Sequence, residues 1–279
     1  MAGFSPEWLA LREPADHAAR NPQVLAAVGG HFADKASLSV LDLGCGAGSN
    51  LRAAYAILPD RQHWTLVDHD AALLGFARER LTHWADEARE QGEELVLAKD
   101  GKTITVDTRK IDLNTDLEWV LGWQPDLVTA AALFDLASKR WIERFVAALA
   151  AQHLPLYTVL THDGRESWLP EHLADAGIHA AFTDHQHRDK GFGPATGPDA
   201  CKVMAEAFRK SGFAVSSGDS DWLLDATRRP LQEALAEGIA AAVGETGRLD
   251  PKAIADWLAA RREAESAMIG HQDLWARPI

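Results

Sequence analysis

A glycine-rich turn is the part of the sequence with the clearest capacity for chemistry. Residues 39–50 read SVLDLGCGAGSN, in which an apolar run carrying Asp42 leads into alternating glycines at Gly44, Gly46 and Gly48. Positions without a side chain let a ligand lie directly on the backbone, and a helix N-terminus directs free N–H groups at it. Since a helix-compatible segment follows, the stretch predicts strand, turn and helix around a nucleotide-like cofactor.

A second acidic residue supports this interpretation. Asp68 ends the strand-like run Trp64 to Val67 and follows Gly44 by 68 − 44 = 24 residues. A carboxylate at the end of a second strand can accept both hydroxyls of a ribose. Such an acid also serves NAD, but a dinucleotide-binding turn reads G-x-G-x-x-G, and its third glycine is replaced here by Ser49.

The order D-x-G-x-G-x-G resembles the first motif of class I S-adenosylmethionine-dependent methyltransferases. Asp112, after Lys110 and Ile111, stands where that family usually places an acid near the adenine amino group. The resemblance implies S-adenosyl-L-methionine as cofactor and a Rossmann-like α/β fold with a seven-stranded sheet. It also implies a set of cofactor-binding residues: Asp42, Gly44, Cys45, Gly46, Gly48, Asp68, His69, Asp112, Leu113 and Ala131.

Histidines are the candidates for proton transfer. His162 follows the strand-like run 156–161, where it would sit beside the methyl group and titrate near neutral pH as a general base. His185, with His187 beside it, is a rival in a mixed-charge segment. A structural hydrogen bond explains His162 equally well, and a solvated helix end equally explains the segment around His185.

The residues expected to bind substrate come from three segments. Small-molecule methyltransferases often place leading helices as a lid that excludes water, which points to Trp8, Arg12 and His31 in the helical run 6–31, although ordinary helix packing also accounts for them. The other two candidates are Asp135, which could instead cap a helix, and Arg188. Asp135 with Asp163 could hold Mg²⁺, but the spacing fits the metal-dependent branch poorly, so no metal is expected.

The elements that must position these residues follow from hydrophobic periodicity. Strands are predicted near 38–43, 63–68, 126–130, 156–161 and 213–218, and residues 267–276 could form an antiparallel seventh strand. Helices are predicted near 49–58, 70–88, 138–151, 171–188, 198–212, 229–243 and 251–268. The Asp-Gly at 100–101, between 94–98 and 103–106, predicts a small hairpin inserted before Asp112.

These elements predict one methyltransferase domain over residues 1–279 with helical insertions. Its parts are an N-terminal helical lid (1–36), a cofactor-binding half (37–163) and a substrate-side insertion with the C-terminal half (164–279). The role of residues 164–200, which the generic fold does not require, is open.

Composition limits the environment and the partners. The chain has 279 residues, 47% of them hydrophobic, with two cysteines, no signal-peptide pattern and no apolar run of membrane-spanning length. We therefore expect a cytoplasmic protein without disulfides. The net charge of −13 disfavours a nucleic-acid substrate, because phosphate binding draws on Lys and Arg. The oligomeric state is not determined.

Absent motifs narrow the acceptor. The segment after the fourth strand reads Ala131-Ala132-Leu133-Phe134, not the N-P-P-[YF] tetrapeptide of enzymes that methylate base amino groups. The prediction is therefore methyl transfer to a small molecule on O, N, S or C. The alternatives are a macromolecular (RNA or protein) methyltransferase, a non-catalytic S-adenosylmethionine-binding protein and, more distantly, an oxidoreductase.

Overall fold

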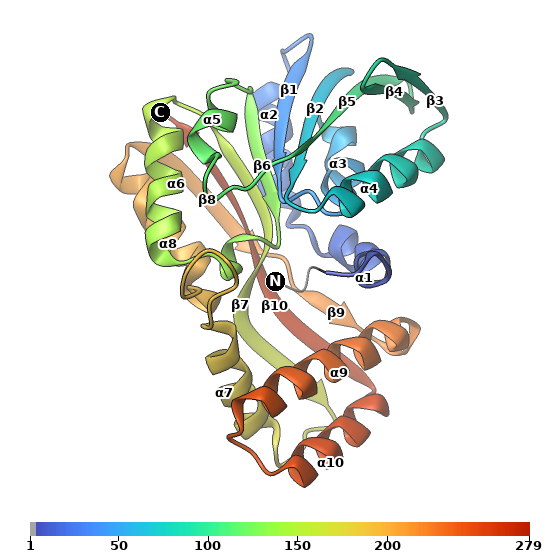
Figure 1. Cartoon of the computed structure of the whole chain (residues 1–279), viewed down its shortest axis with the longest axis vertical. Coiled ribbons are helices and arrows are strands. Elements are labelled where there is room, and N and C mark those ends of the chain that lie inside the picture. Colours follow the sequence, from blue (N-terminus) through green and yellow to red (C-terminus); the bar gives the residue numbers. More distant parts are fainter. Residues whose placement is uncertain (1–3) are drawn as a thin grey trace.

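The protein is built around one large, mixed sheet. The computed structural model describes residues 4–279, and its sheet has the strand order β3-β4-β5-β2-β1-β6-β7-β10-β8, with β9 paired to β10 (Figure 1). Strands β5, β2, β1, β6 and β7 are parallel, while β10 runs antiparallel between β7 and β8. The strands are β1 (Leu38–Leu43), β2 (Arg61–Asp68), β3 (Glu87–Gln91), β4 (Glu94–Lys99), β5 (Lys102–Lys110), β6 (Leu127–Ala131), β7 (Leu156–Leu169), β8 (Phe213–Asp219), β9 (Trp222–Leu224) and β10 (Ser266–Pro278). The expected seven-stranded core with an antiparallel last strand is confirmed.

Helices cover both faces of this sheet, which explains why its central strands are apolar along their length. On β1, Val40 belongs to one core cluster together with Trp64, whereas Leu41 and Leu43 belong to a second cluster on the other face. The helices are α1 (Pro6–Ala19), α2 (Pro22–Phe32), α3 (Ser49–Ala54), α4 (Ala71–Trp84), α5 (Leu117–Leu121), α6 (Lys139–Ala151), α7 (Asp175–Gln186), α8 (Ala200–Lys210), α9 (Arg229–Thr246) and α10 (Pro251–Arg262).

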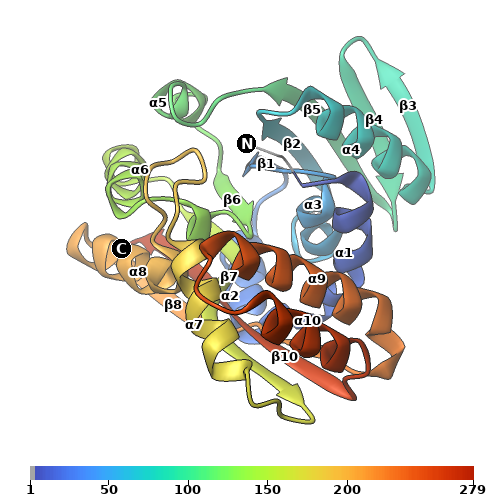
Figure 2. The ribbon, with the colours of Figure 1, turned by 60° about the horizontal axis from the view of Figure 1, so that its bottom comes forward.

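Two strands extend well beyond the sheet. Strand β7 continues past residue 161, where the sequence predicted its end, to Leu169, and it pairs with β10 from Ser266 onward. The two form a long antiparallel ribbon against which α7, α9 and α10 lie in the lower half of the molecule (Figures 1 and 2). His162 therefore lies within a strand and not in a loop. The helix predicted for 251–268 ends at Arg262 because the following residues join this ribbon.

The hairpin at residues 94–106 was predicted in the right place but with the wrong role. Asp100 and Gly101 do form its turn, with φ of 49° and 80°. However, β5 is no insertion, since it pairs in parallel with β2 along its whole length and leads directly to Asp112. Strand β3 extends the hairpin at residues 87–91, so the helix predicted for 70–88 ends at Trp84.

The two N-terminal helices have different positions. Helix α2 packs beside β8 and β10, and the backbone N–H of Asn21 before it donates to Asp273 Oδ2 at 2.9 Å. Helix α1 instead lies below the carboxyl ends of the parallel strands (Figure 1). Of the residues predicted to form a lid (1–36), those of α1 lie at this edge of the sheet, whereas those of α2 do not. None of the helices in residues 4–279 has the length and apolar character needed to cross a membrane.

A buried carboxylate fixes α1 in this position. Glu13 receives hydrogen bonds from Arg52 Nε at 2.7 Å and Nη2 at 2.9 Å, and from Arg80 Nη2 at 2.8 Å. Arg52 is on α3 and Arg80 on α4, so this cluster ties three helices together. Burial by itself raises the pKa of Glu13, but the two arginines outweigh it and the pKa is lowered.

We predict that Glu13→Gln lowers the free energy of unfolding by about 3–5 kcal/mol at pH 7, because it leaves buried Arg52 without its counter-charge. Since the pKa of Glu13 is lowered on folding, its contribution is present above the unfolded-state pKa and is lost as the pH falls through the folded-state value. Urea unfolding at pH 7 and pH 3.5 measures both effects, with exposed Glu7→Gln on the same helix as control. Equal stability of the two variants at pH 7 would contradict the prediction.

Candidate active site

The glycine turn adopts a backbone that only glycine accepts without strain. Gly44, Gly46 and Gly48 all have positive φ, at 62°, 50° and 71°. A Cβ on Gly44 would also lie 3.3 Å from Leu133, and one on Gly46 would lie 3.2 Å from Leu9 of α1. A side chain at Gly44 or Gly46 would therefore crowd these neighbouring leucines.

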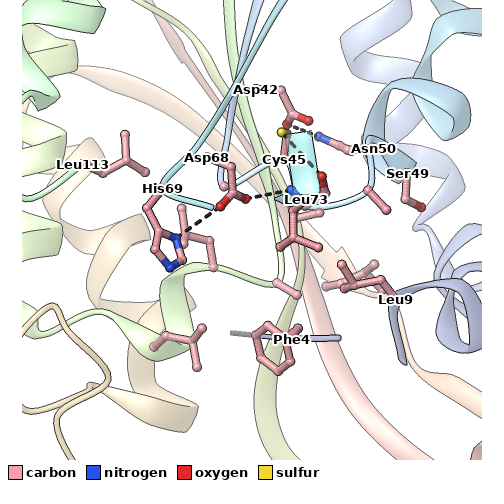
Figure 3. A pocket seen from close by; sticks show the side chains of 18 of the residues that line it. Phe4, Leu9, Asp42, Cys45, Ser49, Asn50, Asp68, His69, Leu73 and Leu113 are labelled. Carbon is pink, nitrogen blue, oxygen red and sulfur yellow. Dashed lines mark hydrogen bonds and ion pairs between the residues drawn. The ribbon is translucent and has the colours of Figure 1, made fainter. Parts of the chain in front are cut away.

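Asp68 connects this turn to the end of β2. Its Oδ2 accepts the Gly46 N–H at 2.9 Å, and its Oδ1 accepts the Asp70 N–H at 3.0 Å and lies 3.2 Å from His69 Nδ1 (Figure 3). Asp68 is 6% exposed. The carboxylate is therefore held in one orientation, with lone pairs left over for a ligand.

A cavity of about 380 Å³ lies along the turn and the ends of β1, β2 and β6 (Figure 3). Its wall contains every residue predicted to bind the cofactor except Gly48, which instead begins α3 as its N-cap. Those wall residues are Asp42, Gly44, Cys45, Gly46, Asp68, His69, Asp112, Leu113 and Ala131. Ser49, which replaces the third glycine of a dinucleotide turn, is bonded through its hydroxyl to His17 Nε2 at 2.9 Å.

One end of this cavity holds buried polar atoms that are not satisfied within residues 4–279. Asn50 donates to Asp42 Oδ1 at 2.8 Å, and Arg20 donates to Asn50 Oδ1 at 2.7 Å. Asp42 Oδ2 and Arg20 Nε and Nη1 have no partner in that part of the chain. Burial raises the pKa of Asp42 to about 7. Sequence reasoning missed Arg20, which stands alone after α1 and carries no motif.

A second, smaller cavity, called the inner chamber below, adjoins the first. It measures about 120 Å³ and shares Phe4, Arg12, Ala132, Leu136 and Leu160 with the first cavity. The remaining wall residues come from α1, the segment after β6, α7, α9, β9 and the ribbon: Trp8, Asp135, His162, Glu166, Phe182, Gln186, Trp222, Leu235, Ile239, Ile269 and His271. Three of the predicted residues besides Arg12 therefore meet here, namely Trp8, Asp135 and His162.

Arg12 stands at the junction of the two cavities and is held rigidly. Its guanidinium forms a bidentate pair with Asp16, at 2.8 and 3.1 Å, and lies 4.9 Å from the centre of the Trp222 ring. Trp222 in turn donates its indole N–H to Asp16 at 3.0 Å. Ala132 and Leu160, which also line both cavities, have φ of 51° and 57°, a strained conformation that tends to concentrate at functional sites.

Two histidines lie side by side in the chamber wall. His162 and His271 are opposite each other on β7 and β10, with ring centres 5.7 Å apart. Gln186 Nε2 lies 3.0 Å from His162 Nδ1, while His271 Nδ1 lies 3.0 Å from the carbonyl of Ile269. Burial lowers the pKa of both, so each is neutral at pH 7. His271 was missed because its partner lies 271 − 162 = 109 residues away in sequence.

The other candidates lie outside both cavities. His185 Nε2 and Arg188 Nη1 contact the same carboxylate, Glu245, at 3.0 and 3.1 Å, and His187 Nδ1 contacts the Ala195 carbonyl at 3.0 Å. His31 lies on α2 and packs against Trp275 of β10, and it lines neither cavity. The roles predicted for His185 and Arg188 stay predictions from the sequence. Within residues 4–279 no three His, Cys, Asp or Glu side chains form a group suited to a metal ion.

Comparison with solved structures identifies the fold. A cyclopropane-fatty-acyl-phospholipid synthase-like protein from Lactobacillus casei is 16% identical, with 97% of this chain and 94% of that one covered and a TM-score of 0.51. The cyclopropane synthase MmaA2 from Mycobacterium tuberculosis is 13% identical, with 98% and 95% covered and a TM-score of 0.50. The chain has the class I methyltransferase fold. No family model and no curated protein matches the sequence itself.

Asp42 is a buried acid at the end of the cofactor cavity. We predict that the free energy of unfolding depends on its protonation. Because folding raises the pKa of Asp42 to about 7, the ligand-free protein loses stability as the pH rises from about 4 to 7, by roughly 1.4 kcal/mol for each unit of pKa shift. Asp42→Asn should reduce this fall. Urea unfolding at pH 5 and pH 8 tests it, and a fall of the same size in the variant would exclude Asp42 as its cause.

Proposed function

We propose that the protein is an S-adenosylmethionine-dependent methyltransferase that acts on a small molecule. The observation that carries the proposal is the inner chamber, which shares five wall residues with the cavity along the glycine turn. When bound, S-adenosylmethionine supplies a methyl group activated by a sulfonium. The protein's residues would orient that group and its acceptor, exclude water and accept a proton.

The unsatisfied polar atoms suit both charged groups at the amino-acid end of this cofactor. Arg20 Nε and Nη1 can donate to a carboxylate, and Asp42 Oδ2 can accept from an ammonium group. At the other end, Asp68 can accept ribose hydroxyls, and Asp112 stands where the family resemblance implies an acid near the adenine. A dinucleotide fits less well, because its pyrophosphate would approach the carboxylates of Asp42 and Asp68 at the turn.

The chamber favours an enzyme with a small acceptor over the alternatives. A protein that only binds the cofactor has no use for a second cavity beside it. The chamber measures only about 120 Å³, with Trp8, Phe182 and Trp222 in its wall, which suits a small acceptor better than a macromolecule. A cytoplasmic location and the absence of nucleic-acid partners stay predictions from the sequence.

We predict that calorimetric titration detects micromolar binding of S-adenosylmethionine and S-adenosylhomocysteine, and none of NAD. Asp68→Ala should weaken both adenosyl ligands at least about 10-fold, because each hydrogen bond to a charged group contributes about 1.5–3 kcal/mol. Exposed Asp34→Ala is the control and should bind as the unmodified protein does. Binding of NAD without binding of either adenosyl ligand would contradict the proposal and indicate an oxidoreductase instead.

We predict that Arg20→Gln weakens S-adenosylhomocysteine by about 10- to 150-fold, the equivalent of the same 1.5–3 kcal/mol. Methylthioadenosine lacks the carboxylate and should lose little affinity. The comparison separates a ligand contact from a structural role for Arg20. If both ligands lose affinity equally, Arg20 supports the fold of the cavity and does not contact the carboxylate.

A further inference from the structure

The inner chamber offers a ligand both kinds of hydrogen-bonding group. Gln186 donates its amide N–H to His162 Nδ1 at 3.0 Å, so neutral His162 carries its ring proton on Nε2 and can donate it. The acceptors include Asp135 Oδ1 and Gln186 Oε1, which are buried without a partner within residues 4–279. A ligand that satisfies this wall must therefore accept a hydrogen bond and also donate one.

The other charged groups of the wall are engaged. Arg12 uses Nε and Nη2 for its bidentate pair with Asp16, which leaves Nη1 for a ligand. Glu166 accepts the indole N–H of Trp168 at 2.5 Å and lies 3.7 Å from His179 Nδ1. Of the two acids in the wall, Asp135 is therefore the one with a buried oxygen that has no partner in the described part of the chain.

Asp135 and His162 lie close enough for one small group to contact both. Of the charged groups that shift the pKa of His162, Asp135 has the largest effect, and His162 in turn has the largest effect of any charged group on the pKa of Asp135. Such effects weaken with distance. The chamber that both residues line measures about 120 Å³, less than the roughly 150 Å³ cavity that holds benzene, so a small ligand reaches its walls on all sides.

A hydroxyl group fits this pair of residues better than the other groups that accept a methyl. Its oxygen has two lone pairs, so one can accept the His162 N–H while the other attacks the methyl carbon, and its proton faces Asp135. The nitrogen of a neutral amine has a single lone pair, which cannot serve both purposes. A thiol is a weak donor and a weak acceptor, a carboxylate has no proton for Asp135, and a carbon atom leaves both residues unpaired.

We propose that the methyl acceptor is a small aliphatic alcohol whose hydroxyl enters the inner chamber, accepts the Nε2–H of His162 and gives its proton to Asp135 Oδ1. This inference rests on the proposed methyltransferase function and narrows the accepting atom to oxygen. It changes the roles expected from the sequence, since His162 orients the hydroxyl as a donor and Asp135 is the general base.

The reaction balances without a further reactant. A lone pair of the hydroxyl oxygen forms the new O–C bond to the methyl group, and the electron pair of the broken C–S bond stays on sulfur. The hydroxyl proton passes to the Asp135 carboxylate, so the products are a methyl ether, S-adenosylhomocysteine and protonated Asp135. The carboxyl group returns its proton to solvent when the ether departs.

The environment of Asp135 suits a base. Burial raises the pKa of its carboxyl group, and the nearby His162 and Arg12 oppose this rise without cancelling it. A carboxylate with a raised pKa is a stronger base than one in water. Asp135 lies in the single turn Phe134–Leu136 after β6, shortly beyond Ala132, whose strained backbone lines both cavities.

The test uses four probes that share a three-carbon chain and differ in the functional group: 1-propanol, propylamine, propanethiol and propionate. Each is titrated at pH 7.5 into the full-length protein saturated with S-adenosylhomocysteine, and nitrogen-15 NMR of the histidine rings follows binding. We expect 1-propanol to bind at least about threefold more tightly than each of the others, because it alone pairs with both residues. The Nε2 signal of His162 should shift as 1-propanol binds.

Two variants separate contact with the hydroxyl from acceptance of its proton. Asp135→Asn keeps an oxygen that can accept the O–H, so the affinity for 1-propanol should stay within about twofold, whereas Asp135→Leu should lower it at least about fivefold. Formation of the methyl ether from S-adenosylmethionine and 1-propanol should fall at least about 100-fold in Asp135→Asn, because an amide cannot take the proton. Exposed Asp34→Asn is the matched control and should change neither quantity.

The outcomes separate the inference from the function on which it rests. Normal S-adenosylhomocysteine binding with no preference for 1-propanol, or with a preference that persists in Asp135→Leu, overturns the alcohol proposal and leaves the methyltransferase proposal standing. Failure of S-adenosylhomocysteine to bind overturns both. No ether from the unmodified protein, or equal rates in Asp135→Asn, excludes Asp135 as the base, and a His162 ring proton on Nδ1 excludes that residue as the donor.

Discussion

The buried carboxylate of Glu13 is the interaction on which the geometry of the site depends most. It joins α1, which carries the lid residues, to Arg52 in the helix that follows the glycine turn and to Arg80 on α4. Through this connection Arg12, in the middle of α1, and Arg20, which caps its C-terminus, line the cofactor cavity. A buried ion pair of this kind adds little net stability compared with apolar packing, but losing one partner is costly, so it fixes the position of the helix.

The ribbon of β7 and β10 creates the second compartment. By continuing beyond the sheet, the two strands place His162 and His271 opposite each other and give α7 and α9 a surface to cover (Figure 2). The chamber then forms between this addition and the carboxyl ends of the parallel strands, where ligands bind in open α/β sheets. The elongation of two ordinary strands thus creates a second cavity beside the first.

The two cavities offer different chemical groups to a ligand. The cofactor cavity presents both a free cationic edge, at Arg20, and a free acidic oxygen, at Asp42, and so suits a zwitterion. In the inner chamber, Asp135 Oδ1 and Gln186 Oε1 have no partner within residues 4–279, aromatic rings line the wall, and Arg12 is already paired with Asp16. Arg12, which belongs to both walls, separates these environments and is held there by Asp16 and Trp222.

The sequence by itself determined the cofactor half of this protein. The turn at Gly44 to Gly48, Asp68 and Asp112 are local signals, because a backbone with positive φ needs glycine and the acids follow directly from strands whose ends meet at one edge of a sheet. The tertiary structure alone decided the inner chamber. Whether a hairpin strand joins the main sheet, where β7 ends and which histidine faces His162 depend on pairings between residues far apart in the chain. Hydrophobic periodicity does not specify such pairings. Arg20 and His271 carry no sequence motif, and only the folded structure places them in the walls of the two cavities.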